Sequence, residues 1–360
     1  MAQAKRRIVV GMSGGVDSSV SAALLLQDGW EVIGVTLDFV CDGSGCCDAA
    51  DAHAVCGALG IRHLHRDCSP AFEERVIRPF CDAYAAGLTP SPCPGCNATT
   101  KIPELLEAAR EVGATHVATG HCARIDKTPE GRFAVRAAAD GRKDQSYMLS
   151  RLTQEQLACL VLPLGAMEKA QVRALAASLG LPVAQRPDSE DLCFAPQGYR
   201  ALLAERGVEG VPGPIRDSAG KVLGTHTGLL EYTIGQRGGL GIGGLPAPLY
   251  VMEKDAADNA IVVGFAGEAK MRGCGVRDAV WQAVPAPDQP LDASVKLRYR
   301  SAPAPCIIRP GTQSGTFRVE LAEPRALTAP GQYAVFYRGD TVLGSAMISR
   351  IVRVDQEMGE

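Results

Sequence analysis

The first 120 residues alternate between short apolar strand patterns and helical patterns, with a glycine-rich loop between the first strand and the first helix. The strand pattern RIVVGM leads into this loop, and the helical pattern SSVSAALLLQDG ends at Gly29. The alternation continues through WEVIGVTLDF, IRHLHRDC and ATHVATGH, with helical stretches between them. This order predicts a mostly parallel sheet with helices on both faces. Ligands of such sheets bind beyond the carboxyl ends of the strands.

Composition divides the 360 residues into three predicted domains. Residues 1–195 carry the strand and helix alternation and predict a Rossmann-like parallel sheet. Residues 196–255 are rich in Gly and Pro and predict a small α+β module between the larger domains. Residues 256–360 lose helical periodicity and show short alternating runs such as ASVKLRYRS and GTFRVELA, which predict a C-terminal β-barrel.

Charge and cysteine usage narrow the class of protein. The net charge of −3 does not favour a general polyanion binder, so any surface for nucleic acid must be local. Thirteen cysteines are scattered without an apolar leader, which predicts reduced thiols, a cytoplasmic location and no membrane attachment. Five of them lie inside helical or strand patterns and are predicted to fill apolar cores: Cys56, Cys68, Cys81, Cys122 and Cys159.

The loop GMSGGVDSSV has the residues of an anion site, because it follows a strand and opens a helix. It contains no GK[ST] and no GxGxxG, so it is neither a Walker A loop nor a dinucleotide fingerprint. Gly14 and Gly15 permit close approach of a phosphate, and Asp17 can hold Mg²⁺ between phosphate oxygens. Hydroxyl groups come from Ser13, Ser18 and Ser19. A pyrophosphate fits this set.

Two separated cysteines have the features of reactive thiols. In SPCPGCN, Asn97 is predicted to cap a helix, which places Cys96 where the positive helix end favours a thiolate and a nucleophile. About a hundred residues later, Cys193 lies among charged residues in RPDSEDLCFAP, where a buried filler is improbable.

The stretch SGGVDSS resembles the loop of the ATP pyrophosphatases, the PP-loop superfamily, which split ATP between its α and β phosphates to adenylate a substrate oxygen. An adenylating loop together with two exposed cysteines indicates sulfur transfer. Adenylation makes AMP the leaving group, a persulfide sulfur attacks the activated carbon, and a second cysteine cleaves the sulfur–sulfur bond.

Eight stretches occur in the order and approximate spacing of the tRNA-specific 2-thiouridylase family, which the chain resembles from residue 8 to about residue 350. They are GMSGGVDSSVSA, TPSPCPGCN, ATGHCAR, KDQSYMLS, DSEDLCF, GLLEYTIGQRGGLGIGG, LRYRS and PGQYAVFY. The resemblance implies that the wobble uridine of certain tRNAs becomes 2-thiouridine. It also implies ATP, Mg²⁺ and sulfur delivered as a persulfide by a cysteine desulfurase or a sulfur relay protein.

The resemblance assigns roles to particular residues of this chain. Cys96 matches the nucleophile and Cys193 the persulfide carrier, and the two become a disulfide when sulfur is released. The residues that match the ATP site are Gly11, Met12, Ser13, Gly14, Gly15, Val16, Asp17, Ser18, Leu37 and Gly120. The residues that match contacts with the tRNA or its target base are Ser91, Pro92, Cys93, His121, Lys143, Asp144, Gln145, Arg298, Tyr299 and Gln332.

Two residues depart from the pattern of many family members, which have Asn at the position of Ser91 and Asp at the position of Cys93. The carboxylate proposed to handle protons or metal is therefore missing, and other sulfur chemistry stays open. Cys93, Cys96 and Cys193 could hold a 4Fe–4S cluster through three thiolates, with one iron left to bind hydrosulfide. A structural zinc would need a fourth ligand that the sequence does not name.

Other readings of the chain also stay open. Cys41, Cys46 and Cys47 form a tempting metal motif, but adjacent cysteines rarely ligate one ion, and we interpret them as structural or incidental. A rival function is that of an ATP pyrophosphatase acting on a small metabolite, but this function does not explain the presence of Cys96 and Cys193. A second rival is a non-catalytic, metal-holding tRNA-binding protein. The intact phosphate loop and the two thiols are evidence against it.

Overall fold

The computed structural model describes residues 6–40, 49–187 and 192–357, and divides into two compact units. The first unit comprises Met1–Arg78, Pro92–Gly198 and Asp340–Leu343. The second unit comprises Pro79–Ser91, Tyr199–Gly339 and Gly344–Glu360. Cys41, Cys46 and Cys47 lie outside the described residues. The domain boundaries near residues 195 and 255 stay predictions.

A five-stranded parallel sheet forms the centre of the first unit, in the order β3-β2-β1-β4-β7. Its strands are β1 (Arg7–Gly11), β2 (Glu31–Asp38), β3 (Arg62–Asp67), β4 (His116–Ala118) and β7 (Leu160–Val161). The chain runs outward from β1 to β3 and then returns to place β4 on the other side of β1. The loops that follow β1 and β4 therefore diverge at the carboxyl edge, which is where ligands of such sheets bind.

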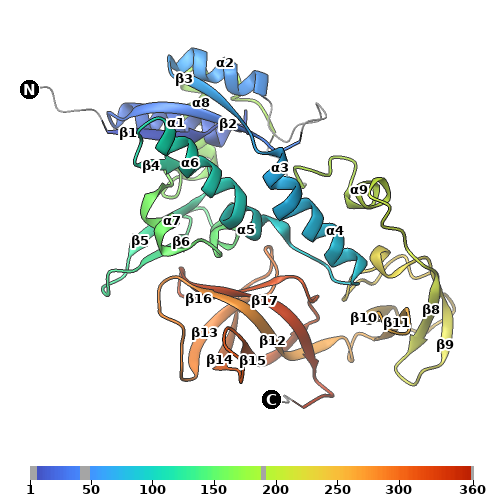
Figure 1. The fold of residues 1–360 in the computed structure, drawn as a ribbon. Coiled ribbons are helices and arrows are strands. Elements are labelled where there is room, and N and C mark those ends of the chain that lie inside the picture. The colour runs from blue at the N-terminus through green and yellow to red at the C-terminus, as the bar shows by residue number, and fades with distance from the viewer. Residues whose placement is uncertain (1–5, 41–48, 188–191, 358–360) are drawn as a thin grey trace, which may run out of the picture. The chain divides into compact units, whose positions relative to one another are not determined.

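Alternation of side chains along β1 decides which helices cover which face. Ile8 and Val10 point into a core made with α1 (Val16–Gln27), α2 (Ala49–Leu59) and α8 (Lys169–Ser178). Gly11 faces the opposite side, where Leu105 of α6 (Ile102–Glu111) lies so close that a Cβ on Gly11 would be 3.1 Å from its Cδ1. Figure 1 shows α2 and α6 on opposite sides of the sheet.

The remaining elements of the first unit lie outside this five-stranded sheet. Asp340 accepts hydrogen bonds from Arg124 and Arg136, which lie on a two-stranded hairpin. The hairpin consists of β5 (Ala123–Lys127) and β6 (Phe133–Ala137). The helical segments are α3 (Ser69–Phe72), η1 (Glu73–Ile77), α5 (Pro92–Cys96), η2 (Asn97–Lys101), η3 (Ser146–Leu149) and α7 (Gln154–Cys159), while α4 (Arg78–Ala85) lies almost wholly in the second unit.

A four-stranded sheet occupies the first part of the second unit, in the order β10-β11-β8-β9. The strands are β8 (Gly213–Asp217), β9 (Val222–His226), β10 (Leu249–Asp255) and β11 (Ala260–Phe265), with η4 (Leu229–Glu231) between β9 and β10. The short helix α9 (Tyr199–Glu205) begins with Tyr199, whose ring stacks on Tyr84 of α4 with centroids 4.7 Å apart.

Six antiparallel strands form a closed barrel in the second unit, because β12 pairs with both β15 and β17. The strands are β12 (Lys270–Trp281), β13 (Leu291–Lys296), β14 (Ala304–Pro310), β15 (Phe317–Ala326), β16 (Tyr333–Arg338) and β17 (Thr341–Arg353). Trp281 stacks on Phe336 and meets Phe317 edge-on, with ring centroids 5.6 and 5.2 Å apart. Aromatic packing thus fills the core that the alternating pattern predicts.

The predicted fold class is confirmed: a parallel α/β sheet is followed by a small module and a β-barrel. Of the five cysteines predicted to fill cores, Cys56, Cys68, Cys81 and Cys122 are buried, whereas Cys159 is only half-buried. Within the described ranges, no helix is both long and apolar enough to cross a bilayer.

Leu105 is fully buried between α6 and the sheet. Replacing it with Ala should therefore leave a cavity and lower the free energy of unfolding by about 2–5 kcal/mol. Urea denaturation followed by circular dichroism measures this effect. Leu179→Ala is the matched control, because that side chain is 38% exposed and its loss should change stability by no more than about 0.5 kcal/mol. Equal stabilities for the two variants would contradict the packing described for α6.

Candidate functional site

The loop between β1 and α1 is organised by its own serine side chains. The Ser13 amide donates to Ser18 Oγ at 3.3 Å, and Ser18 Oγ donates to the Gly15 carbonyl at 3.1 Å. Ser19 is fully buried and also donates to the Gly15 carbonyl, at 2.8 Å. The hydroxyl of Ser19 therefore shapes the loop, which corrects the prediction that it faces an anion. Helix α1 begins at Val16, and its N-cap residue Gly15 has no side chain to bond the first amides, so these amides remain suited to an anion.

Gly120 packs directly against the first turn of α1. A Cβ on this residue would lie 2.7 Å from the Ser18 amide nitrogen and 2.8 Å from the Asp17 carbonyl carbon, closer than real contacts allow. Leu37 is buried near the end of β2, and the neighbouring Thr36 donates to the Met12 carbonyl at 3.0 Å. The residues predicted to bind ATP therefore lie at one carboxyl edge of the sheet.

A lysine that the sequence did not single out pairs with the predicted magnesium residue. Lys169, the first residue of α8, places Nζ 2.6 Å from Asp17 Oδ1, and its side chain is only 11% exposed. Arg186 adds a second cation by donating to the Gly14 carbonyl at 3.3 Å. These cations come from 152 and 172 residues further along the chain, and no local sequence signal connects them to the loop. Together they make this loop suitable for phosphate.

Cys96 lies inside a helix and not at its beginning, because α5, η2 and α6 form one continuous helical segment. The prediction that Asn97 caps a helix is therefore wrong. The Asn97 side chain is buried and its Nδ2 donates to the Met148 carbonyl at 2.9 Å, so a tertiary contact uses the group that was expected to cap. Burial raises the pKa of Cys96 to about 12, so at rest this residue is a protonated thiol.

The structure brings three predicted thiols within electrostatic range of one another. Burial raises the pKa of half-buried Cys93, and the neighbouring thiol of Cys193 raises the pKa of both Cys93 and Cys96 further. Cys193 is exposed, whereas Cys96 is only 9% exposed. Among the residues that the structure describes, no three His, Cys, Asp or Glu side chains are arranged to hold a metal ion. The three thiols thus converge without forming a ready metal site.

Two of the residues predicted to contact tRNA in the first unit form hydrogen bonds within the chain. Asp144 is buried and accepts from the Ala138 and Ser146 amides at 3.1 and 3.0 Å. Gln145 Oε1 accepts from the Cys122 amide at 2.8 Å, and Lys143 is half-buried. Asp144 and Gln145 hold the turn that follows β6, so an RNA contact of these residues stays a prediction.

His121 follows Gly120 at the edge of the same sheet. Its Nδ1 lies 2.8 Å from Thr119 Oγ1. Desolvation, with a smaller contribution from Lys101, lowers the pKa of His121 to about 3. The ring is therefore neutral near pH 7, so it can accept or donate a hydrogen bond but supplies no positive charge to the site.

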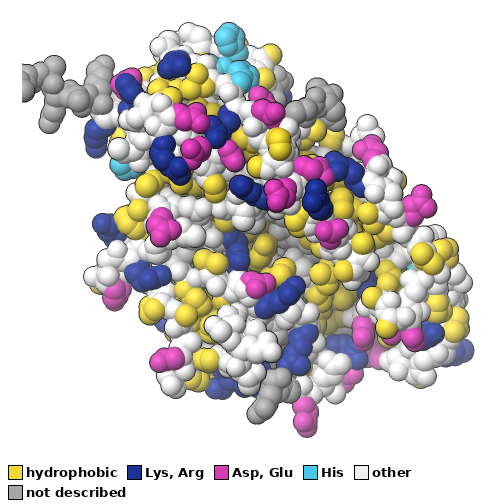
Figure 2. All heavy atoms as spheres, viewed as in Figure 1, with side chains coloured by type: hydrophobic (Ala, Val, Ile, Leu, Met, Phe, Trp, Pro, Cys, Tyr) yellow, Lys and Arg dark blue, Asp and Glu magenta, His cyan; other side chains and the backbone are white. Residues whose placement is uncertain are grey.

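Several residues predicted to contact tRNA in the second unit form hydrogen bonds with backbone groups of that unit. Arg298 Nη2 donates to the Leu327 and Ile234 carbonyls at 2.8 and 3.2 Å. Gln332 Nε2 donates to the Thr89 carbonyl at 2.8 Å, and the Ser91 amide donates to the Gly331 carbonyl at 3.4 Å. Figure 2 shows basic and acidic side chains interspersed on the face in view.

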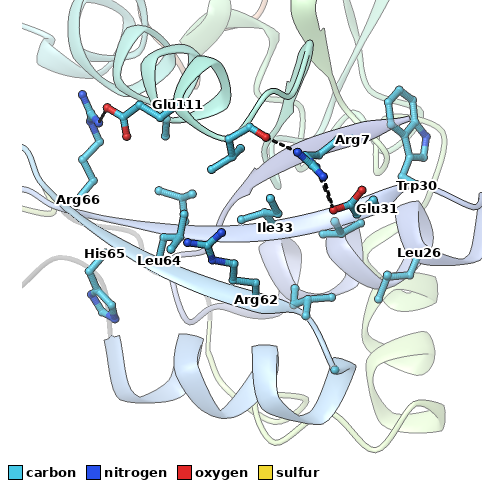
Figure 3. A pocket seen from close by; sticks show the side chains of 16 residues that line it. Arg7, Leu26, Trp30, Glu31, Ile33, Arg62, Leu64, His65, Arg66 and Glu111 are labelled. Carbon is cyan, nitrogen blue, oxygen red and sulfur yellow. Dashed lines mark hydrogen bonds and ion pairs between the residues drawn. The ribbon is translucent and has the colours of Figure 1, made fainter. Parts of the chain in front are cut away.

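A pocket of about 820 Å³ lies away from these residues, on the sheet face beside α6. Its lining includes Ile33, Arg62 and Leu64, together with the ion pair between Arg7 and Glu31 (Figure 3). None of the predicted site residues lines this pocket. The candidate site is therefore the edge that carries the loop and the thiols, and not this pocket.

Three protein-family models match successive parts of the chain. The family described as "tRNA methyl transferase HUP domain" matches residues 6–197, "tRNA methyl transferase PRC-barrel domain" matches residues 201–265, and "Aminomethyltransferase beta-barrel domain" matches residues 271–348.

Several curated proteins are similar over nearly their whole length, and each is named tRNA-specific 2-thiouridylase MnmA. The protein from Trichormus variabilis is 43% identical over 350 residues, which cover 96% of this chain and 99% of that protein. The protein from Chloroflexus aurantiacus is 44% identical over 354 residues, with 95% and 98% covered. The protein from Heliobacterium modesticaldum is 43% identical over 360 residues, with 96% and 93% covered.

Gly120→Ala should displace the first turn of α1 and weaken nucleotide binding at least about tenfold, because the added Cβ meets backbone atoms that cannot move aside cheaply. Isothermal titration calorimetry with ATP measures the change. Gly57→Ala is the matched control, since a Cβ there meets nothing within 4 Å and the residue lies inside α2. Unchanged affinity in Gly120→Ala would show that this contact does not shape the site.

Proposed function

The chain belongs to the tRNA-specific 2-thiouridylase family, and from this premise we propose that it uses ATP to replace the C2 oxygen of the wobble uridine of tRNA, at tRNA position 34, with sulfur. The observation that carries this proposal is the identity of 43–44% over 95–96% of the chain to proteins of that name. The phosphate loop and the converging thiols support it with matching chemistry at one sheet edge.

Adenylation is the first step of the proposed reaction. The uncapped amides of α1 and the ammonium of Lys169 suit the phosphates of ATP. The C2 oxygen of uridine attacks the α-phosphorus, and pyrophosphate leaves. The bond to AMP then turns a poor leaving oxygen into a good one.

Mg²⁺ fits the carboxylate of Asp17, because this ion commonly uses one or two carboxylates together with substrate phosphates. The Asp17 side chain is 32% exposed, so its oxygens are accessible, although Lys169 pairs with Oδ1. The ion would supply charge neutralisation at the phosphates. In the same step Lys169 exchanges its bond to Asp17 for a bond to phosphate oxygen.

Sulfur transfer is the second step, and its atoms balance between two cysteines. A donor protein, either a cysteine desulfurase or a sulfur relay protein, leaves a terminal sulfur on exposed Cys193 as a persulfide. That sulfur attacks C2 of the adenylated uridine and AMP departs. Cys96 then attacks the Cys193 sulfur, which releases 2-thiouridine and leaves a Cys96–Cys193 disulfide for an external thiol to reduce.

The burial of the thiols agrees with this division of labour. The carrier must meet a donor protein, and Cys193 is exposed; the resolving thiol must wait inside the site, and Cys96 is buried. We propose that the reaction takes place in the cytoplasm, because reduced thiols are typical of that compartment.

The route through a 4Fe–4S cluster receives less support from the described residues. Cys93 would supply the third thiolate, yet the side chains of Cys93, Cys96 and Cys193 are not arranged as a metal site in the described part of the chain. We therefore derive no step through a cluster, and the persulfide route remains the proposed one.

Cys96→Ser and Cys193→Ser should each lower 2-thiouridine formation to below about one per cent of wild type, because each removes a sulfur that forms a bond in the transfer. Nucleoside mass spectrometry of tRNA measures the product, and pyrophosphate release should continue. Cys159→Ser, which changes a half-buried cysteine with no assigned role, is the matched control. Wild-type yield in either active-site variant would exclude the mechanism.

Iron content separates the two sulfur routes. Protein purified without iron, then loaded with persulfide and given ATP and unmodified tRNA, should form 2-thiouridine and lack the broad absorbance near roughly 400 nm of an iron–sulfur chromophore. If product formation instead rises in proportion to bound iron and this absorbance, the persulfide route is replaced by the cluster route.

A further inference from the structure

The helical segment that carries Cys93 and Cys96 widens into a π-helical turn at η2, directly after Cys96. Pro103 explains this widening, because a proline has no amide hydrogen to donate to the Thr99 carbonyl four residues earlier. π-helical turns inside α-helices are rare and occur frequently at functional sites. We therefore expect this turn to position a side chain that acts in the site.

Three side chains, two of them from other elements, donate hydrogen bonds to carbonyl groups in and around the widened turn. Arg75 Nη1 donates to the Thr99 carbonyl at 3.1 Å, and Gln156 Nε2 donates to the Ala98 carbonyl at 2.7 Å. Thr99 Oγ1 donates back to the Gly95 carbonyl at 3.0 Å. Three carbonyl groups in and around the turn thus have dedicated side-chain donors, so the turn is held in place from several directions.

The wider turn changes which residue lies above Cys96. In an α-helix the i→i+4 register would place Thr100 there, whereas the i→i+5 register of a π-turn places Lys101 there. Burial has the largest effect on the pKa of Cys96, and the charge and the backbone amide of Lys101 act in the opposite direction. Lys101 also acts electrostatically on Cys93, where its charge lowers the pKa against the larger effect of burial.

The site requires a positive charge at this position. Sulfur carries negative charge as the attacking thiolate, as the persulfide and as the released C2 sulfur, and burial disfavours each of these anions. His121 cannot supply the charge because its ring is neutral near pH 7. Lys169 is bonded to Asp17 at the phosphate loop. The charge of Lys101 acts on Cys93, Cys96 and His121 alike.

We propose that Lys101 is a positioning residue of the sulfur-transfer step, held over Cys96 by the π-helical turn so that its ammonium neutralises the negative charge on the sulfur being exchanged. The proposal rests on the proposed function and deepens it. The exchange itself needs no proton from Lys101. Cys96 loses its thiol proton and attacks the Cys193 sulfur, and the bond between that sulfur and the sulfur on C2 breaks. The negative charge moves to the C2 sulfur, and uptake of a proton at N3 of the product balances the proton that Cys96 loses. Lys101 stays protonated throughout.

Lys101→Gln and Lys101→Arg test the role of the charge. In a Cys93→Ser, Cys193→Ser background, iodoacetamide should alkylate Cys96 about tenfold more slowly in Lys101→Gln than with Lys101 intact, and Lys101→Arg should restore the rate to within about threefold. Peptide mass spectrometry follows the labelling. Lys127→Met, at an exposed position of β5, is the matched control and should leave the rate unchanged.

The same variants with all cysteines present test the reaction. Starting from enzyme with persulfide already on Cys193, Lys101→Gln should form 2-thiouridine about 10- to 100-fold more slowly in a single turnover, while pyrophosphate release stays within about twofold of wild type. Equal alkylation rates for Lys101→Gln and the Lys101 protein would overturn the inference. So would a Lys101→Arg variant as slow as Lys101→Gln, since the charge would then be irrelevant.

These readouts separate this inference from the proposed function. If the wild-type enzyme forms no 2-thiouridine, the proposed function fails, whereas the alkylation rates still decide whether Lys101 acts on Cys96. If Lys101→Gln does not fold, as judged by circular dichroism, Pro103→Ala replaces it. This variant keeps the lysine but restores an amide donor for an α-helical register, and it should slow Cys96 alkylation. A wild-type rate would count against the π-turn as the positioning device.

Discussion

The close approach of Gly120 to the backbone of Asp17 and Ser18 is the contact on which the site depends. It joins the loop after β4 to the first turn of α1 at the point where the sheet order reverses. A side chain at this position would separate two segments that have to meet for one ligand to touch both. The serine hydroxyls of the loop bond to one another and to Gly15, so the loop keeps its shape while the helix amides stay available.

Burial determines how readily each thiol forms a reactive thiolate. A thiolate is the reactive form of cysteine, and desolvation makes that form costly at Cys96, Cys56 and Cys68 alike. The pKa of Cys56 is raised by burial alone, whereas at Cys96 the charge and the amide of Lys101, on the same helical segment, oppose the effect of burial. The site thus combines protection of a buried thiol at rest with a local charge for the moment at which the sulfur becomes anionic.

Sequence patterns predicted those elements whose structure is determined by residues close together in the chain. The strand, loop and helix around Gly11–Asp17, and the alternating strands of the barrel, follow from periodicity within a few residues. Partnerships across long stretches of chain escaped such patterns, as with Lys169 and Asp17. The error at Asn97 has a local cause: Asn is a good cap, but the helix had already begun at Pro92, and Pro103 widened it where a new start was expected.

The ion pair between Asp17 and Lys169 explains how a carboxylate can stand in a phosphate loop. A triphosphate would be repelled by an isolated Asp17, and a buried Lys169 would lose hydration without a partner. At 2.6 Å each group compensates the charge of the other. In the proposed reaction, nucleotide with Mg²⁺ would offer each group a replacement, since the ion suits the carboxylate and the phosphates suit the ammonium. Binding would then exchange one ion pair for two, so that neither charge lacks a partner.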